Sequence, residues 1–381
     1  MKSKEIIKIL YLFLIWLVFL STVVILADRF LPYRPSFPYS SEFYKYGLSH
    51  SISKLANFDG VHYLTISQRG YVGTGLIQAF FPLYPLAMNF ANHLFHNYMV
   101  SGLMVSHFFA FLSFYAFYYL VKMDYGKKIA FSSLIIFAFF VTSFYLRSLY
   151  GESLFLTLIF GSLIAAKKKY YLLAGVLGAL ASATRIVGIF IWPSLLLLTF
   201  LKDRKNIRAY LAVSLSGLGL FAYMTYLNWQ FGDPLFFFHL QDDFGASRQT
   251  QLIAYPQVVY RYFRILATVR PFDLKYYAYL QEFLLSLLAL GGLAIIAWQT
   301  WKEKIKMNWA YLLFAVGAYF LPTLTGNFSS MPRYIMVCFP LFIYLALILD
   351  KKPLLKFFYL TISLIFLIIN LLLFSQGYWV A

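Results

Sequence analysis

The chain has 381 residues, of which 61% are hydrophobic and only 12% charged, and its formal net charge is +18. Soluble domains usually carry about 25% charged residues, so this composition excludes a soluble globular protein. We attribute the excess of lysine and arginine to the basic cytoplasmic loops of a membrane protein, and we expect no nucleic-acid partner.

Long apolar runs recur from one end of the sequence to the other, separated by short lysine-rich breaks. A helix needs roughly 20 apolar residues to cross a bilayer, and continuous rather than alternating runs favour helices over a β-barrel. We therefore predict an all-α polytopic membrane protein, organised as one multi-spanning domain over residues 1–381. The predicted crossings, about eleven, are 7–27, 99–121, 129–146, 150–165, 171–185, 186–201, 209–229, 278–301, 309–323, 335–349 and 357–375.

The first apolar run extends from Ile6 to Ala27 and ends in Asp28-Arg29. A signal peptide would have an apolar core of about 7–15 residues followed by a small-residue cleavage site. This run is longer and ends in charged residues, so we predict that it is the first anchor helix.

The basic breaks between crossings predict the orientation of the chain. An even number of predicted crossings separates each of these breaks from the next, and all of them fall on the side of the N-terminus. Because cytoplasmic loops are enriched in Lys and Arg, we predict a cytoplasmic N-terminus in an inner (plasma) membrane, or in the endoplasmic reticulum if the source is eukaryotic. The basic breaks are 122–128, 167–169, 202–208, 302–306 and 351–356.

Two long segments then face outward, residues 28–98 and residues 231–277. Both are rich in aromatic residues and proline, and stretches such as 80–90 are typical of helices that lie in the membrane interface. Arginine is concentrated on this predicted outer side, whereas only Arg204 and Arg208 fall on the lysine-rich side. Arginine binds phosphate through a planar fork, so this asymmetry predicts a polar site on the outer face.

Asp59 lies between apolar neighbours at the start of a predicted amphipathic helix in the first outward segment. One interpretation is an N-cap, for which Asp is well suited. The other is a general base, held partly dry so that it can take a proton from a hydroxyl group. His62 lies on the same helical face, and it either orients the carboxylate, contacts substrate or is merely structural.

Arg185 lies between two apolar runs with almost no loop around it. A charge near membrane depth is costly unless it is paired, which marks Arg185 as a candidate functional residue. Glu152 is in a similar position and is a candidate partner for Arg185 or for Arg147. A purely structural ion pair is the alternative.

Four sequence blocks follow one another along the chain: Phe58-Asp59-x-x-His62-Tyr63 with Arg69-Gly70-Tyr71 and Phe80–Leu86; Tyr150-Gly-Glu152-Ser153-Leu-Phe155; Ser182-Ala-Thr-Arg185-Ile-Val-Gly188; and Pro332-Arg333-Tyr334 with Pro340-Leu341. In this order they resemble the PIG-V type of mannosyltransferase, which adds the second mannose of glycosylphosphatidylinositol anchors and has prokaryotic relatives. The resemblance covers roughly residues 55–345, with Phe58 where the family usually has Trp. The chain is shorter than those enzymes and looks prokaryotic, so its acceptor is expected to differ.

The resemblance implies a GT-C glycosyltransferase, a helical membrane enzyme whose donor is a sugar on a polyprenyl phosphate. It places the catalytic carboxylate on Asp59, which would deprotonate a hydroxyl of a lipid, glycan or protein acceptor. The sugar, mannose by resemblance, would be transferred with inversion. Arg333 beside Tyr334 is then the first choice for binding the donor phosphate, and Arg69 is a further candidate; interfacial snorkelling is the alternative for Arg333.

No cofactor and no metal site are expected. The single cysteine, Cys338, excludes an intramolecular disulfide and a cysteine-based metal site. His93-x-x-His96 has ligand-like spacing but no acid nearby in sequence.

Three competing functions remain open at this point. A transporter or lipid flippase would predict inverted repeats, and the sequence has no clear repeat. A non-catalytic scaffold would leave the outward arginines and acids unexplained. A GT-C enzyme for another sugar, such as an arabinosyl-, glucosyl- or aminosugar transferase, is also compatible with the sequence.

Overall fold

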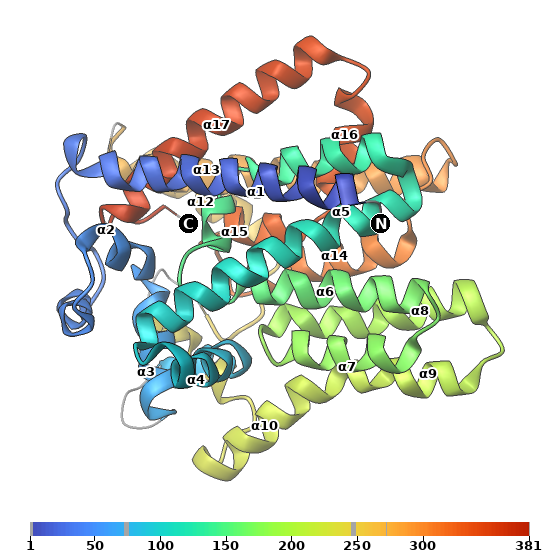
Figure 1. Cartoon of the computed structure of the whole chain (residues 1–381), viewed down its shortest axis with the longest axis horizontal. Coiled ribbons are helices and arrows are strands. Elements are labelled where there is room, and N and C mark those ends of the chain that lie inside the picture. Colours follow the sequence, from blue (N-terminus) through green and yellow to red (C-terminus); the bar gives the residue numbers. More distant parts are fainter. Residues whose placement is uncertain (1–2, 72–75, 245–248, 272, 381) are drawn as a thin grey trace. The chain divides into compact units, whose positions relative to one another are not determined.

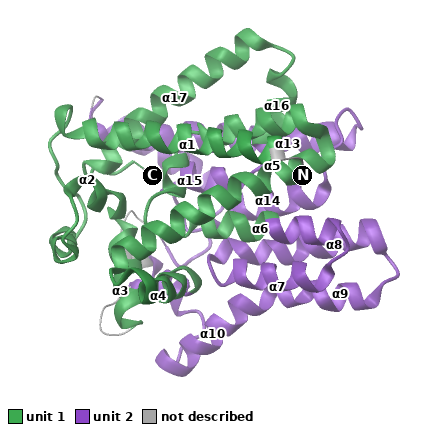
Figure 2. Cartoon of the chain, in the orientation of Figure 1, with its two compact units in different colours: residues 1–72, 83–160, 342–380 green, residues 73–82, 161–341, 381 purple. Residues whose placement is uncertain are grey.

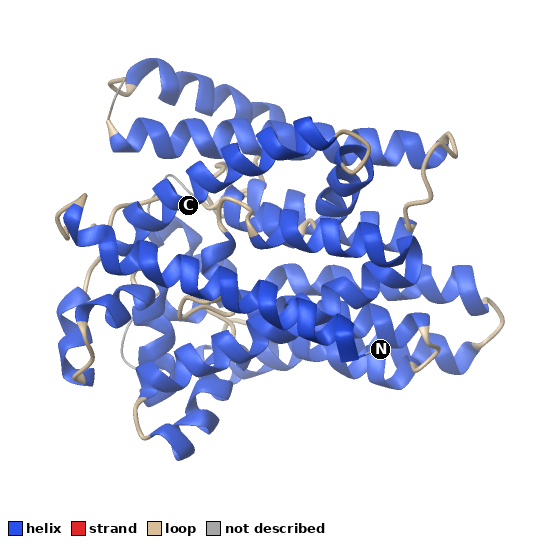
Figure 3. Ribbon diagram, turned by 45° about the horizontal axis from the view of Figure 1, so that its top comes forward, coloured by secondary structure: helices blue, strands red, loops and turns tan. Residues whose placement is uncertain are grey.

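The computed structural model describes residues 3–71, 76–244, 249–271 and 273–380 (Figure 1). Within these ranges every regular element is a helix, as the sequence predicted (Figure 3). The chain divides into two compact units, which Figure 2 colours separately. Unit 1 comprises residues 1–72, 83–160 and 342–380, and unit 2 comprises residues 73–82, 161–341 and 381.

Unit 1 is built around three long helices, α1 (Ser3–Leu26), α5 (Tyr98–Ala138) and α17 (Pro353–Ser375). Helix α1 packs against both α5 and α17, and the buried Trp16 contacts Phe114 of α5 in a tilted arrangement with ring centroids 5.2 Å apart. The shorter elements are η1 (Ala27–Arg29), η2 (Ser40–Tyr46), α2 (His50–Ser53), η3 (Lys54–Ala56), α3 (Asp59–Arg69), α4 (Leu83–Phe95), η5 (Ser143–Leu146), the first part of α6 (Glu152–Lys167) and most of α16 (Pro340–Leu349).

Unit 2 contains a close-packed group in which α7 (Tyr171–Ser182) contacts α9 (Ile207–Ser214) and α10 (Leu218–Phe231). Gly175 and Gly219 allow this approach, because a Cβ atom at either position would lie within 2.0 Å of a carbonyl oxygen of the facing helix. Small residues serve this purpose between membrane helices. The other elements are η4 (Ile77–Ala79), η6 (Ile186–Phe190), α8 (Ile191–Asp203), η7 (Leu215–Gly217), α11 (Phe236–His239), η8 (Leu240–Phe244), α12 (Tyr255–Thr268), α13 (Leu274–Trp301), α14 (Trp309–Thr323) and α15 (Met331–Val337).

Six helices in the described part of the chain are long and apolar enough to cross a membrane, and α15 with α16 makes a seventh if the two form one broken span. The chain is therefore a multi-pass membrane protein. The predicted count of eleven is not confirmed, because the helices α6, α7 and α14 have only 16, 12 and 15 residues. The six are Lys4–Arg29, Tyr98–Ala138, Ile186–Asp203, Ile207–Phe231, Leu274–Trp301 and Pro353–Ser375.

Two predicted crossings differ from the structure in their helical extent. The crossing predicted at 129–146 is wrong in its second half, because α5 ends at Ala138 and residues 140–150 are buried without forming an α-helix. The apolar character of these residues reflects burial inside the protein. The crossing predicted at 335–349 is broken before Pro340, whose ring disfavours helical geometry in the preceding residue.

The lysine-rich break predicted at 122–128 corresponds to a kink inside α5. Gly126 has φ 77° and ψ 177°, which is far from helical values, and helix continues on both sides. Glycine reaches positive φ without a steric penalty, so the kink falls where the sequence allows it.

Candidate active site

The segment that presents Asp59 has an unusual backbone. Phe58 occupies the N-cap position of α3 with φ 61° and ψ −114°, and Asp59 is the first helical residue. A positive φ at an aromatic residue costs of the order of 1–3 kcal/mol and persists only where the surrounding structure enforces it. The N-cap interpretation of Asp59 is therefore wrong, since Phe58 holds that position and no side chain makes a capping hydrogen bond there.

Tyr150 connects the Asp59 segment to the start of α6. Its buried hydroxyl donates to the Asn57 carbonyl oxygen at 2.8 Å and accepts from the Asp59 amide at 3.2 Å. Glu152 follows two residues later as the first residue of α6 and is 1% exposed. Unit 1 thus brings the Asp59 backbone to the loop that ends in Glu152. Tyr150 is part of one of the four sequence blocks, but the sequence did not predict its contact with the Asp59 segment.

His62 lies one turn after Asp59 on α3 and is half-buried. Burial lowers the pKa of the His62 imidazole, and the negative charge of Asp59 opposes that shift. The ring is therefore neutral near pH 7, where it can both donate and accept a hydrogen bond. The Asp59 carboxylate is thus close enough to act electrostatically on the His62 ring.

Arg69 does not lie beside Asp59. It is exposed at the C-terminal end of α3, roughly 15 Å along the helix axis from Asp59. Its positive charge instead acts on the carboxyl group of Glu42, whose pKa it helps to lower after the larger effects of a hydrogen bond and the charge of Lys45.

Arg147 does not pair with Glu152, which removes one of the two partners suggested for that acid. Its Nη1 atom donates to the Ser21 hydroxyl at 2.9 Å and to the Leu17 carbonyl oxygen at 3.3 Å, both on α1. The buried guanidinium therefore ties the 143–151 segment to α1.

In unit 2, the guanidinium groups of Arg185 and Arg333 both lie beside the ring of the third predicted site residue, Tyr334. The guanidinium of Arg185 lies 5.0 Å from the centroid of the Tyr334 ring, and that of Arg333 lies 6.0 Å from the same centroid. Arg185 is 9% exposed, while Arg333 and Tyr334 are half-buried. Both guanidinium groups thus lie within cation–π distance of one tyrosine ring.

A buried carboxylate fixes the turn that leads to Arg333 and Tyr334. Glu282 of α13 is fully buried, and its Oε1 atom accepts from the Ser330 amide at 3.1 Å. The Ser330 carbonyl oxygen in turn accepts from the amides of Arg333 at 3.0 Å and Tyr334 at 3.2 Å. Glu282 is thus connected to the first turn of α15 through one residue, Ser330, which itself has φ 64°.

Helix α12 supports the same turn from a second direction. The Tyr262 hydroxyl donates to Glu282 Oε2 at 2.7 Å and accepts from the Phe328 amide at 3.1 Å. Arg261 donates to the Gly326 carbonyl oxygen at 3.2 Å. Sequence reasoning missed this role of Glu282 and Tyr262; the only signal was an acid at the edge of an apolar run.

The candidate residues therefore form two groups, each fixed within its own unit. Asp59, His62 and Glu152 belong to unit 1, and Arg185, Arg333 and Tyr334 belong to unit 2. One shared pocket for both groups stays a prediction. In the described part of the chain, no three His, Cys, Asp or Glu side chains converge in a way that could hold a metal ion.

Comparison with solved structures finds similarity to the oligosaccharyltransferase of Archaeoglobus fulgidus. Its complex with Zn and sulfate has a TM-score of 0.50 and 12% identity, with 96% of this chain and 53% of that chain covered. The fold resembles that of this oligosaccharyltransferase. The form tethered with an acceptor peptide containing the NVT sequon has a TM-score of 0.48, 15% identity, and coverage of 97% and 55%. The complex with an inhibitory peptide and a dolichol-phosphate has a TM-score of 0.45, 13% identity, and coverage of 97% and 56%.

The chain spans about half the length of the oligosaccharyltransferase chains it matches. At these identities the likeness concerns the fold alone. No protein-family model matches the sequence, and a search of curated proteins found no match. The resemblance to the PIG-V type is therefore not confirmed, whereas the helical membrane fold is similar to that of the archaeal oligosaccharyltransferase.

Proposed function

We propose that this protein is an inverting GT-C glycosyltransferase that moves a sugar, mannose by resemblance, from a polyprenyl-phosphate donor to a lipid, glycan or protein acceptor. The observation that carries the proposal is the strained, tightly held segment that presents Asp59 at the start of α3. Residues are kept in costly backbone conformations where a side chain must be held in one orientation. The GT-C-like fold supports the same class of enzyme.

Asp59 acts as the general base in the proposed reaction. Its carboxylate takes the proton of an acceptor hydroxyl as the oxygen attacks the anomeric carbon from the side opposite the phosphate. The new glycosidic bond forms while the bond between the anomeric carbon and the phosphate oxygen breaks. The lipid phosphate leaves with the electron pair, and the configuration at the anomeric carbon inverts.

Arg333 and Arg185 bind the donor phosphate in this proposal and stabilise the charge that develops on it during transfer. Hydrogen-bond donors that already point at the phosphate lower the barrier because they need no reorganisation in the transition state. Tyr334 holds both guanidinium groups beside its ring. His62, neutral near pH 7, and Glu152 are proposed to bind sugar or acceptor hydroxyl groups, with no role for a cofactor.

The test of this function uses the purified full chain with a radiolabelled polyprenyl-phosphate mannose and membrane extracts as the source of acceptor. We expect label to appear in an extract component only when the protein is present. Parallel reactions with glucosyl and arabinosyl donors identify the sugar. Absence of transfer from all three donors would reject the proposed enzyme class.

The proposed site lies on the non-cytoplasmic face of the membrane, which a cysteine-labelling experiment checks. Tyr44 is 80% exposed, whereas the native Cys338 is fully buried, so a Tyr44→Cys variant presents one accessible thiol. We expect an impermeant thiol reagent to label this variant in intact cells. A Lys205→Cys variant, at an exposed position predicted to be cytoplasmic, should react only after lysis. The opposite pattern would reverse the proposed orientation.

A further inference from the structure

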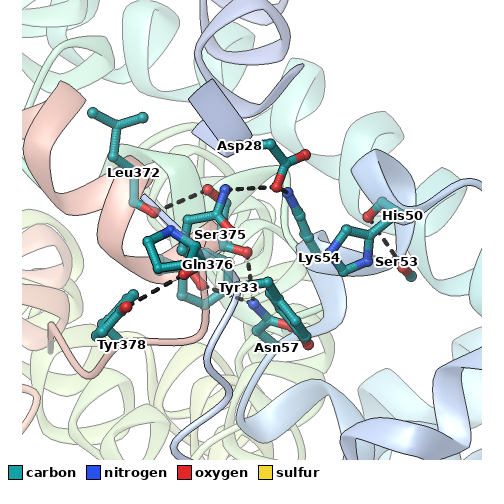
Figure 4. Close-up of polar contacts among 12 residues, drawn as sticks. Asp28, Tyr33, His50, Ser53, Lys54, Asn57, Leu372, Ser375, Gln376 and Tyr378 are labelled. Carbon is teal, nitrogen blue, oxygen red and sulfur yellow. Dashed lines mark hydrogen bonds and ion pairs between the residues drawn. The ribbon is translucent and has the colours of Figure 1, made fainter. Parts of the chain in front are cut away.

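Residues 374–379, at the end of α17 and just after it, contact the segment that leads to Asp59, and Figure 4 shows Ser375 and Gln376 beside Asn57 and Lys54. Asn57 is fully buried two residues before Asp59. Its Nδ2 atom donates to the carbonyl oxygens of Phe374 at 2.8 Å and Ser375 at 3.2 Å. These bonds fix the chain immediately before Phe58. We call residues 374–379 the C-terminal clamp.

The C-terminal clamp also contacts the strained residue itself. The Phe58 ring packs against Phe374, with centroids 5.8 Å apart, and against Trp379, with centroids 5.7 Å apart. Both partners belong to the clamp. Phe58 keeps its positive φ only while neighbouring groups enforce it, and these two rings together with the Asn57 bonds are such groups.

An ion pair between the buried Lys54 and the partly exposed Asp28 attaches the clamp to the same segment at a second point. Gln376 Nε2 donates to Asp28 Oδ1 at 3.0 Å, and Lys54 Nζ lies 2.5 Å from that oxygen (Figure 4). The Lys54 side chain is fully buried, so its ammonium depends on the Asp28 carboxylate as counter-charge. Lys54 begins the short helix η3 that leads to Asn57.

The backbone of the clamp is held by residues 34–36. The Gln376 carbonyl oxygen accepts from the Arg34 amide at 2.9 Å, and the Gly377 carbonyl oxygen accepts from the Ser36 amide at 2.8 Å. Gly377 has φ 82°, and a Cβ atom there would lie 2.6 Å from Pro35 Cα. The clamp can therefore be opened by adding one methyl group at Gly377.

We propose that the C-terminal clamp is a positioning element for Asp59. By holding Asn57 and the Phe58 ring it keeps the backbone in the conformation from which α3 starts, and so sets the direction of the Asp59 carboxylate. The inference rests on the proposed role of Asp59 as the general base. It assigns a function in catalysis to residues more than 300 positions away in the sequence.

The variant Gly377→Ala tests the clamp by two independent measurements. In hydrogen–deuterium exchange of the purified protein, we expect amides in residues 54–63 to exchange faster than in the wild type, while α13 is unchanged. In the transfer assay, we expect kcat to fall at least tenfold and the KM for donor to change less than twofold, because the general base is displaced while the arginines are not. Gly291→Ala, in α13 with nothing within 4 Å of the added methyl group, is the matched control and should alter neither measurement.

A second variant keeps the test decisive if Gly377→Ala fails to fold. Trp379→Ala removes a ring that packs on Phe58 and adds no strain, and it should produce the same two changes. Unchanged exchange in residues 54–63 in the folded variants would overturn the proposal, as would unchanged kcat in an active enzyme. If the wild type transfers no sugar, the proposed function fails, whereas the exchange measurement still decides whether the clamp holds the Asp59 segment.

Discussion

Replacing Asp59 by Asn is expected to leave the protein folded and to reduce kcat for sugar transfer by about a thousandfold or more. General bases contribute roughly 10²–10⁴-fold to the rate, and the amide keeps the size of the carboxylate but cannot take a proton. Donor binding depends on the arginines in our proposal, so the KM for donor should change little. Steady-state kinetics with varied donor, together with thermal unfolding of the purified variant, separate loss of chemistry from loss of fold.

The matched control for this substitution is Glu42→Gln in the same unit. Glu42 is an exposed carboxylate whose ion pair with Lys45 also lies at the surface, with a distance of 2.8 Å. Such pairs contribute little to stability. Wild-type rates are expected for the control. Retention of wild-type kcat by the Asp59→Asn variant would remove Asp59 from the mechanism and with it the proposed base.

The long spans could be predicted from sequence because lipid demands continuous apolar runs. The crossings predicted at 7–27, 278–301 and 357–375 correspond to α1, α13 and α17, with starts that differ by about 4 residues. The prediction failed at residues 140–146, where an apolar run is buried inside the protein without forming an α-helix. An apolar sequence indicates that the residues are removed from water, but it does not distinguish the protein interior from the lipid bilayer.

Some elements of the candidate site could also be chosen from sequence. Asp59, Arg185 and Arg333 are charged residues at the edges of apolar segments, where an unpaired ionisable group costs free energy and is therefore a candidate functional residue. The positive φ of Phe58 could not be predicted, because a backbone dihedral angle at an aromatic residue is imposed by its neighbours in space. Those neighbours, including Trp379, are distant in sequence.

The turn before Arg333 in unit 2 likewise depends on a contact between residues that are distant in sequence. Glu282 could be recognised only as an acid near the start of a crossing, whereas its bond to the Ser330 amide joins positions 48 residues apart. A side chain that stabilises a backbone turn from a distant position leaves no short sequence motif. The sequence therefore indicated Arg333, the proposed phosphate ligand, but not Glu282, which fixes the turn before it.

Arg333→Ala is expected to raise the KM for donor about 10–100-fold, with a smaller effect on the KM for acceptor. Hydrogen bonds to charged groups contribute about 1.5–3 kcal/mol, which corresponds to that range. Arg333→Lys should recover only part of the loss, because an ammonium lacks the planar fork that binds two phosphate oxygens. Initial rates at varied donor concentration measure both effects, and unchanged donor kinetics in Arg333→Ala would exclude this residue from the phosphate site.

The position of Arg333 should matter as much as its charge, and a double-mutant cycle with Glu282→Gln distinguishes the two. The amide nitrogen of Gln cannot accept a hydrogen bond, so only one of the bonds from Ser330 and Tyr262 can be kept. Glu282→Gln alone should raise the KM for donor several-fold. In the Arg333→Ala background it should add little, because residues that act through one another are not additive. Full additivity would show that Glu282 affects donor use by a route that does not involve Arg333.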